Sequence, residues 1–183
     1  MNKSRYFDIY EKARNKFVEE FKVNKLSVPK VTAVYVSAGL GNRNVDKNIT
    51  DLTKITGQKV LKMKAKRSVA AFSLREGQDN GAKVTLRRNN MWNFIDKLLN
   101  VALVNDLAFK GFKSTMINNM KKNISFSFGI RDKRIFPEIV EESLRAEGFN
   151  ITVCTNGRDV KDVHYILKEI GFPILKMKEE KSE

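Results

Sequence analysis

Apolar side chains recur along this chain at regular spacings, and these spacings predict its helices. Steps of three and four residues predict amphipathic helices over about residues 4–22, 90–104 and 160–170. Residues 45–56 are predicted to form a further helix that ends near Gly57.

The expected ends of two helices follow from their residue types. Asn89 or Asn90 is a suitable N-cap for the helix near 90–104, because a short polar side chain can accept a hydrogen bond from the first turn. Gly171, with Pro173 just beyond it, is predicted to end the last helix.

Strands are predicted on either side of these helices. The β-branched residues of 31–37 favour a strand, and apolar residues alternate with polar or small ones over 124–130 and 149–153. Phe126 and Phe128 fall on the apolar side of this alternation, so we expect them in the core.

Residues 59–88 are predicted to form a hairpin with one apolar and one basic face. Side chains alternate over 69–74, a turn follows at 76–81, and a second strand comes after it. In this second strand Val84 and Leu86 share one side, whereas Lys83, Thr85 and Arg87 share the other.

Together these elements predict an α+β fold in which helices pack on one face of a mainly antiparallel sheet. We expect one compact domain over residues 1–183.

The charge balance indicates the kind of partner. The chain has 35 Lys and Arg against 21 Asp and Glu, a net charge of +14. Residues 1–137 carry +17, and residues 138–183 carry −3. Basic side chains that neutralise phosphates release counterions, which favours binding to nucleic acid. A basic surface can also bind an anionic membrane, but nucleic acid is the favoured partner.

Half of the net charge lies in residues 59–88, which hold nine basic and two acidic side chains. Two interpretations stay open at this point. The run could be a solvated basic surface, or it could contact phosphates. Strand alternation favours the second interpretation, because it aligns several cations along one side of a sheet, and such a face matches the backbone of folded RNA.

Residue types that carry catalysis or bind metals are scarce. Cys154 is the only cysteine and His164 the only histidine, so we predict neither a disulfide nor a metal site. Cys154 is expected to be a small core residue. We expect no signal peptide, and we find no apolar run of the roughly 20 residues that a membrane span needs. We predict no cofactor, no membrane partner and no enzymatic activity.

Gly39-Leu40-Gly41 follows a strand, which leaves three interpretations open. A dinucleotide fingerprint would need a third glycine where Asn44 stands. The other two are a tight turn and a turn whose backbone N–H groups touch a phosphate. Two functions remain as alternatives to specific RNA binding. One is a general RNA chaperone, and the other is a nucleotide-dependent enzyme.

Several ordered blocks of the sequence resemble one protein family. The blocks are Val28-Pro29-Lys30-Val31, Gly39-Leu40-Gly41, Thr56-Gly57-Gln58-Lys59, Lys64 to Phe72, Arg75-Glu76-Gly77, Gly81 to Arg87, Met91-Trp92 with Phe94, Gly129-Ile130-Arg131, Ile135-Phe136-Pro137-Glu138 and Gly171-Phe172-Pro173. Over about residues 5–175 they resemble the bacterial and organellar members of the L-five family of ribosomal proteins, which bind 5S ribosomal RNA.

The resemblance implies a structural protein that docks a sheet face and nearby loops on 5S ribosomal RNA. This docking lies in the central protuberance of the large subunit, among 23S-type ribosomal RNA and other protuberance proteins. The implied RNA-binding residues are Ser37, Gly39, Gly41, Asn42, Gln58, Lys59, Lys64, Lys66, Arg67, Ser68, Lys83, Thr85 and Arg87. The implied loop near the P-site tRNA comprises Arg75, Glu76, Gly77, Gln78, Asp79, Asn80 and Gly81.

The resemblance also implies two halves within the domain, at about residues 24–80 and 84–177. The second half would face a protein of the small-subunit head and form an intersubunit bridge. The host ribosome would lie in a bacterial cytoplasm or in an organelle such as a mitochondrion.

Some positions depart from the family pattern. Ser37 stands where Asn is frequent, and Arg88 stands where Gly is frequent. The stretch Gln78-Asp79-Asn80 replaces a more apolar or aromatic loop tip, and residues 116–122 lack the usual Gly- and Asp-containing pattern.

Overall fold

Strand β1 lies in the middle of a six-stranded sheet with the order β2-β3-β1-β6-β5-β4. The computed structural model describes residues 4–39, 45–107, 109–120, 123–139 and 148–175. The strands are β1 (Val31–Gly39), β2 (Leu61–Lys64), β3 (Asp79–Leu86), β4 (Ile117–Met120), β5 (Asn123–Ile130) and β6 (Phe149–Thr155). All neighbouring strands run antiparallel.

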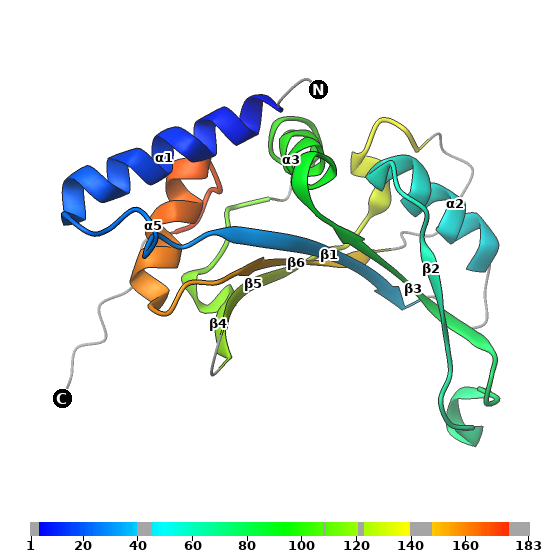
Figure 1. Cartoon of the computed structure of the whole chain (residues 1–183). Coiled ribbons are helices and arrows are strands. Elements are labelled where there is room, and N and C mark those ends of the chain that lie inside the picture. The colour runs from blue at the N-terminus through cyan, green and yellow to red at the C-terminus, as the bar shows by residue number, and fades with distance from the viewer. Residues whose placement is uncertain (1–3, 40–44, 108, 121–122, 140–147, 176–183) are drawn as a thin grey trace.

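The helices cover one face of this sheet (Figure 1). They are α1 (Arg5–Phe21), α2 (Val45–Thr56), α3 (Arg88–Lys97), the π-helical turn η2 (Leu98–Ala102), α4 (Leu103–Asn105) and α5 (Val160–Ile170). Short 3₁₀ turns are η1 (Ala70–Phe72), η3 (Ser114–Met116) and η4 (Lys133–Ile135). The predicted α+β fold, with helices on one face of an antiparallel sheet, is confirmed. No helix within the described residues is both long and apolar enough to cross a membrane.

Alternation along the strands sends apolar side chains toward the helices. Val34 and Val36 of β1, together with Leu86 and Ile151 of its two neighbours, are at most 1% exposed. Phe126 of β5 packs edge-on against Phe112 and Phe172, with ring centroids 5.2 and 5.6 Å away. The predicted core positions of Phe126 and Phe128 are confirmed. Side chains at the intervening positions point to the opposite face, over which no described helix lies.

The hairpin differs from its prediction in one segment. Strands β2 and β3 leave the helix-covered body as an arm, which we define as residues 61–81 (Figure 1). Residues 69–74 do not form a regular strand, because they close the tip of the arm around η1, with one bridge between Val69 and Leu74. The predicted turn at 76–81 is correct at Glu76 and Gly77, but β3 already begins at Asp79.

The predicted helix near 90–104 begins two residues earlier than expected. Its first residue is Arg88, and Arg87 before it is extended and makes no side-chain cap, so neither Asn89 nor Asn90 is the N-cap. Arg88 has a φ of 53°, in the left-handed region, which turns the chain sharply from β3 into α3. The predicted end of α5 at Gly171 is confirmed, since this residue adopts a φ of 110° there.

A buried ion pair joins α2 to the turn that follows β5. Lys133 is 4% exposed, and its Nζ lies 2.7 Å from Asp51 Oδ2 and 2.6 Å from Asn48 Oδ1. All three residues are buried. Taking an ammonium group out of water is costly, so removal of its partner leaves a large desolvation penalty uncompensated. This pair therefore fixes α2 against the sheet.

We expect Asp51→Ala to lower the free energy of unfolding by about 3–5 kcal/mol, because it removes a buried counter-charge that lies 2.7 Å from the Lys133 ammonium. Urea denaturation would measure the change. The matched control is Glu169→Ala, which breaks the partly exposed Lys16–Glu169 pair and should cost less than about 1 kcal/mol. Equal losses in the two variants would contradict a special role for the buried pair.

Candidate nucleic-acid interface

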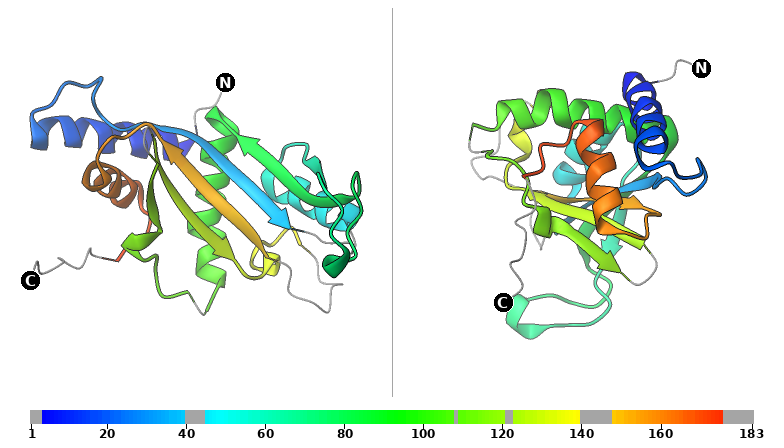
Figure 2. Two further views of the ribbon diagram at one scale, coloured as in Figure 1. Left: turned by 90° about the horizontal axis from the view of Figure 1, so that it is seen from below. Right: turned by 90° about the vertical axis from the view of Figure 1, so that its left-hand side faces the viewer.

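The sheet face opposite the helices presents small polar side chains in register across four strands. One row holds Thr85, Tyr35, Thr152 and Ser127, and the adjacent row holds Lys83, Ser37, Asn150 and Gly129. We call these eight residues the polar face. The view onto this side of the molecule shows the four strands in front and the helices behind them (Figure 2, left).

Contacts between neighbouring strands hold side chains of the polar face in place. The Nζ of Lys83 lies 4.9 Å from the centroid of the Tyr35 ring, a distance typical of a cation–π contact. Ser127 Oγ donates a hydrogen bond of 3.1 Å to Thr152 Oγ1. The face therefore offers a fixed cation beside hydroxyl groups. These hydroxyl groups can donate hydrogen bonds to a sugar-phosphate backbone and accept hydrogen bonds from it.

The basic side chains of residues 59–88 are mostly uncompensated. Lys62 is the exception, because its Nζ lies 2.5 Å from Asp46 Oδ1 and 3.7 Å from Asp79 Oδ2. The hydrogen bond and charge of Asp46 raise the pKa of Lys62. Within the described residues, no ion pair is formed by the other eight, which are Lys59, Lys64, Lys66, Arg67, Arg75, Lys83, Arg87 and Arg88. Their charge is available to an anionic partner.

The predicted RNA-binding residues fall into two separate groups. One group lies on β1 and β3 and comprises Ser37, Gly39, Lys83 and Thr85. Within it Ser37 is the register partner of Lys83, and Gly39 is the register partner of Gly81. Lys64, Lys66, Arg67 and Ser68 lie instead on the exposed arm. Gly41 and Asn42 lie outside the described residues. The structure thus divides one predicted surface into a sheet part and an arm part.

Hydrogen bonds within the arm give its tip a defined shape. Ser68 Oγ accepts from the Glu76 N–H at 2.9 Å, and Gln78 Oε1 accepts from the Arg75 N–H at 3.0 Å. Gly77 has a φ of 80°, and its N–H donates to the Ala65 carbonyl. The hydroxyl of Ser68 and the amide of Gln78 therefore shape the loop, whereas the nearby cations remain exposed.

Two further predicted residues have different surroundings. The Gln58 amide donates to the Thr85 carbonyl at 3.1 Å, so this side chain links the end of α2 to β3. Gly39 is exposed at the end of β1, and a Cβ added there would meet no atom within 4 Å. Gly39 thus leaves open space for a partner, while Gln58 is already engaged inside the protein.

Sequence reasoning missed five residues of the polar face, which are Tyr35, Ser127, Gly129, Asn150 and Thr152. Alternation alone marks each of them as opposite to the core. Their assembly into rows depends on β6 pairing with both β1 and β5, which the sequence pattern does not show. The strand order is therefore the missing information.

Cys154 also lies on this side of the sheet, so its prediction as a core residue is wrong. It is half-buried and alternates with the buried residues Val153 and Thr155 of β6. Burial raises the pKa of its thiol, and the positive charge of Lys83 opposes this effect. Within the described ranges, no group of three or more His, Cys, Asp or Glu side chains could hold a metal ion.

Comparison with known proteins gives two family matches that cover most of the chain. A family model described as "Ribosomal protein L5" matches residues 24–75, and a second model, which describes the C-terminus of the same ribosomal protein family, matches residues 79–174. The two matches meet within the arm, next to the start of β3.

Curated relatives agree with these matches along nearly the full length. The large ribosomal subunit protein uL5 of Malacoplasma penetrans is 39% identical over 187 residues, which cover 98% of this chain and 98% of the relative. The uL5 protein of Ureaplasma parvum is 36% identical, with 95% of this chain and 97% of the relative covered. That of Ruminiclostridium cellulolyticum is 38% identical, with 85% and 89% covered.

The position of Cys154 gives a test of the polar face in the free protein. Because burial raises the pKa of its thiol, alkylation of the folded protein should reach half of its maximal rate at a higher pH than alkylation of the unfolded chain. Lys83→Ala should move this midpoint higher still, since it removes the nearby positive charge. Iodoacetamide labelling followed by mass spectrometry would measure both. A folded midpoint below the unfolded one would contradict the described surroundings of Cys154.

Proposed function

The chain belongs to the ribosomal protein L5 family, whose members are structural constituents of the large ribosomal subunit rather than enzymes, and from this premise we propose that it binds 5S ribosomal RNA through the polar face and the arm. The observation that carries the proposal is the set of eight uncompensated cations beside a face of small polar side chains. Such a surface suits the backbone of a folded RNA, which proteins recognise largely through shape, phosphates and 2′-hydroxyl groups.

The two parts of the surface would have different tasks. The polar face, which includes Ser37, Lys83 and Thr85, would lie along the RNA backbone together with the neighbouring residues Gly39 and Arg87. The exposed cations Lys59, Lys64, Lys66 and Arg67 would hold phosphates beside it. Gly41 and Asn42 belong to the same proposal on the strength of the sequence resemblance.

The tip of the arm would approach the P-site tRNA. The arm extends away from the helix-covered body, so its tip can reach a partner beyond the RNA on the sheet (Figure 1). Arg75 is exposed there and forms no ion pair with a described residue. Gln78, Asp79, Asn80 and Gly81 would act mainly by positioning the tip.

The second half of the chain would contact a basic protein of the small-subunit head and complete an intersubunit bridge. The last part of the chain, residues 138–183, carries a net charge of −3, which is complementary to such a partner. We also propose that both halves act as one domain in the central protuberance, because β1 pairs with β3 on one side and β6 on the other. Since the matched relatives are bacterial, the proposed location is a bacterial cytoplasm.

Titration of the full chain against 5S ribosomal RNA and an unrelated structured RNA of equal length tests this function. We expect a preference for 5S RNA of a hundredfold or more, on the order of 3 kcal/mol, that persists when the salt concentration is raised. A specific interface keeps its preference because shape and hydrogen bonds add to the screened charge term. Equal, salt-sensitive binding to both RNAs would instead favour a general RNA chaperone.

Replacement of Lys64, Lys66 and Arg67 by Ala should weaken 5S RNA binding and reduce the log–log salt slope by up to about 2–3 units. The matched control replaces Lys12, Lys161 and Lys168 of α1 and α5 by Ala, which removes the same charge from exposed helix positions. Affinity and slope should change much less in this control. Similar changes in both triple variants would mean that only the net charge matters.

Alkylation of Cys154 shows whether the polar face itself is covered. Because this thiol lies beside the two polar rows, bound 5S RNA should slow its reaction with iodoacetamide several-fold. The unrelated RNA at the same concentration is the control. Unchanged labelling at saturating 5S RNA would remove the polar face from the interface and leave the arm alone.

A further inference from the structure

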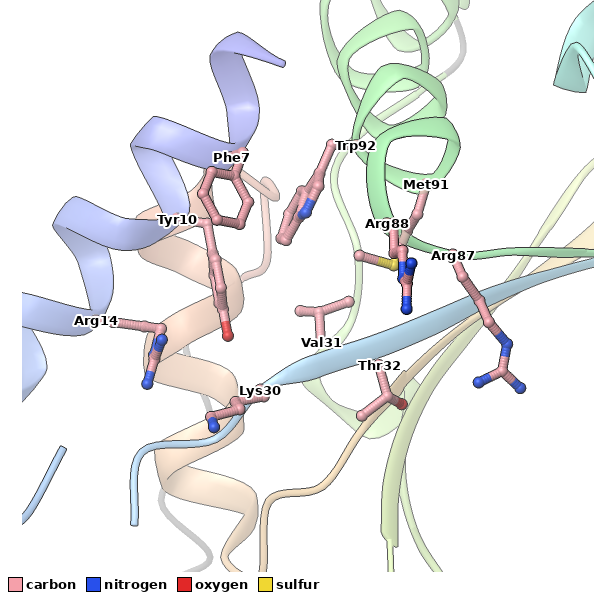
Figure 3. A pocket seen from close by; sticks show the side chains of 10 residues that line it. All are labelled: Phe7, Tyr10, Arg14, Lys30, Val31, Thr32, Arg87, Arg88, Met91 and Trp92. Carbon is pink, nitrogen blue, oxygen red and sulfur yellow. The ribbon is translucent and has the colours of Figure 1, made fainter. Parts of the chain in front are cut away.

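A hollow of about 430 Å³ lies where β3 turns into α3, beside α1 and the start of β1 (Figure 3). Tyr10 of α1 and Trp92 of α3 contribute to one wall, with ring centroids 4.8 Å apart. Val31 and Thr32 of β1 lie below them (Figure 3). This volume falls within the range of pockets that bind small molecules or a single nucleotide.

Of the residues that the structure describes, four cations and no carboxylate line this hollow. They are Arg14, Lys30, Arg87 and Arg88. Among the described residues, Lys30, Arg87 and Arg88 make no ion pair and no side-chain hydrogen bond. Cations that line one hollow without a counter-charge repel one another, so the binding of an anion beside them is favoured.

Arg14 is held in place at the edge of the hollow by contacts within the protein. Its Nη2 donates to the Lys25 carbonyl at 3.1 Å, and its guanidinium carbon lies 5.7 Å from the centroid of the Tyr10 ring. Its Nε is buried and has no hydrogen-bond partner among the described residues. Arg14 is therefore held mainly by the protein itself, and it contributes its positive charge to the hollow.

The backbone of Arg88 shows that this side chain is held in place against a conformational preference. Its φ of 53° lies in a region that residues with a long side chain seldom adopt. Figure 3 shows the Arg88 side chain pointing from α3 toward β1, beside Met91, whereas Arg87 points away from α3. The strained turn thus directs two consecutive arginines to different parts of the lining of the hollow.

We propose that this hollow is a phosphate subsite for RNA, in which Arg88 binds a phosphodiester group that the positive charges of Arg14 and Lys30 help to attract. Guanidinium groups bind phosphate oxygens with paired hydrogen bonds, and the side chain of Arg88 is exposed, so it can reach a phosphate at the rim of the hollow. RNA is favoured over an acidic peptide because Arg87, which directly follows β3, connects the hollow to Lys83 and Thr85 of that strand. The subsite rests on the proposed RNA binding and adds a contact beyond the polar face and the arm.

Three variants of the full chain test the subsite, with 5S ribosomal RNA as the ligand. Arg88→Gly should weaken binding about three- to tenfold and reduce the log–log salt slope by somewhat less than one unit, because one phosphate contact is lost. Lys30→Gln should act in the same direction. Arg88→Ala should weaken binding as much as Arg88→Gly, since both remove the same charge.

Thermal unfolding of the free proteins separates charge from backbone strain. Arg88→Gly should melt at the same temperature as the wild type or higher, because glycine adopts positive φ without steric cost. Arg88→Ala keeps the strain and should melt below Arg88→Gly. Loss of RNA affinity in a variant of undiminished stability would show that the effect is a lost contact, not partial unfolding.

Other outcomes would overturn the subsite. If Arg88→Gly and Lys30→Gln keep the affinity and slope of the wild type while the Lys64, Lys66 and Arg67 variant loses both, the hollow holds no RNA and the proposed function stands. If polyglutamate binding depends on Arg88 while RNA binding does not, the occupant is an acidic protein segment. If the wild type shows no preference for 5S RNA, the proposed function fails, yet an equal loss on the unrelated RNA in Arg88→Gly would still support the phosphate subsite.

Discussion

The structure depends on the pairing of β1 with a neighbour on each side, which sets the direction of every side chain in the centre of the sheet. Because side chains alternate along a strand, a shift of one residue in register would exchange the core face for the polar face. Val34 and Val36 can be buried only if Tyr35 and Ser37 point away from the helices. The core and the candidate interface are therefore two consequences of one register, and neither can change alone.

Periodicity predicts those parts of the chain in which one side of an element packs against the core. It correctly gives α1, α5 and the two strands β5 and β6, as well as the outward direction of Lys83 and Thr85. Periodicity fails for residues 69–74 at the tip of the arm, because no core lies there for one side of a strand to cover. Phe72 is 77% exposed there, so its apolar character does not indicate burial. The pattern also cannot reveal that Lys133 is buried, because this depends on Asp51 from a distant helix.

The arm explains how exposed apolar and basic residues can occur together. Strand β2 is short and has all four side chains exposed, with Leu61 and Met63 alternating with Lys62 and Lys64. A short edge strand that carries lysines resists pairing with other chains, since like charges repel across the edge. Lys62 forms an ion pair with Asp46 of α2, and this pair links the arm to the helix. Lys64 forms no ion pair with a described residue. Lys62 thus contributes to the fold, whereas Lys64, two residues further on, remains available for RNA.

Lys133 and Arg88 illustrate the two ways in which this basic protein uses its cations. Lys133 is compensated inside the protein by Asp51 and Asn48, and it gives rigidity without contributing to the surface potential. Arg88 has a strained backbone, no counter-charge among the described residues, and a side chain that lines a hollow together with other cations. Both features of Arg88 oppose the stability of the free protein, and both would be offset when an anion binds. A side chain that lowers stability in isolation, at a surface position where the core imposes no requirement, is better explained by a partner than by folding.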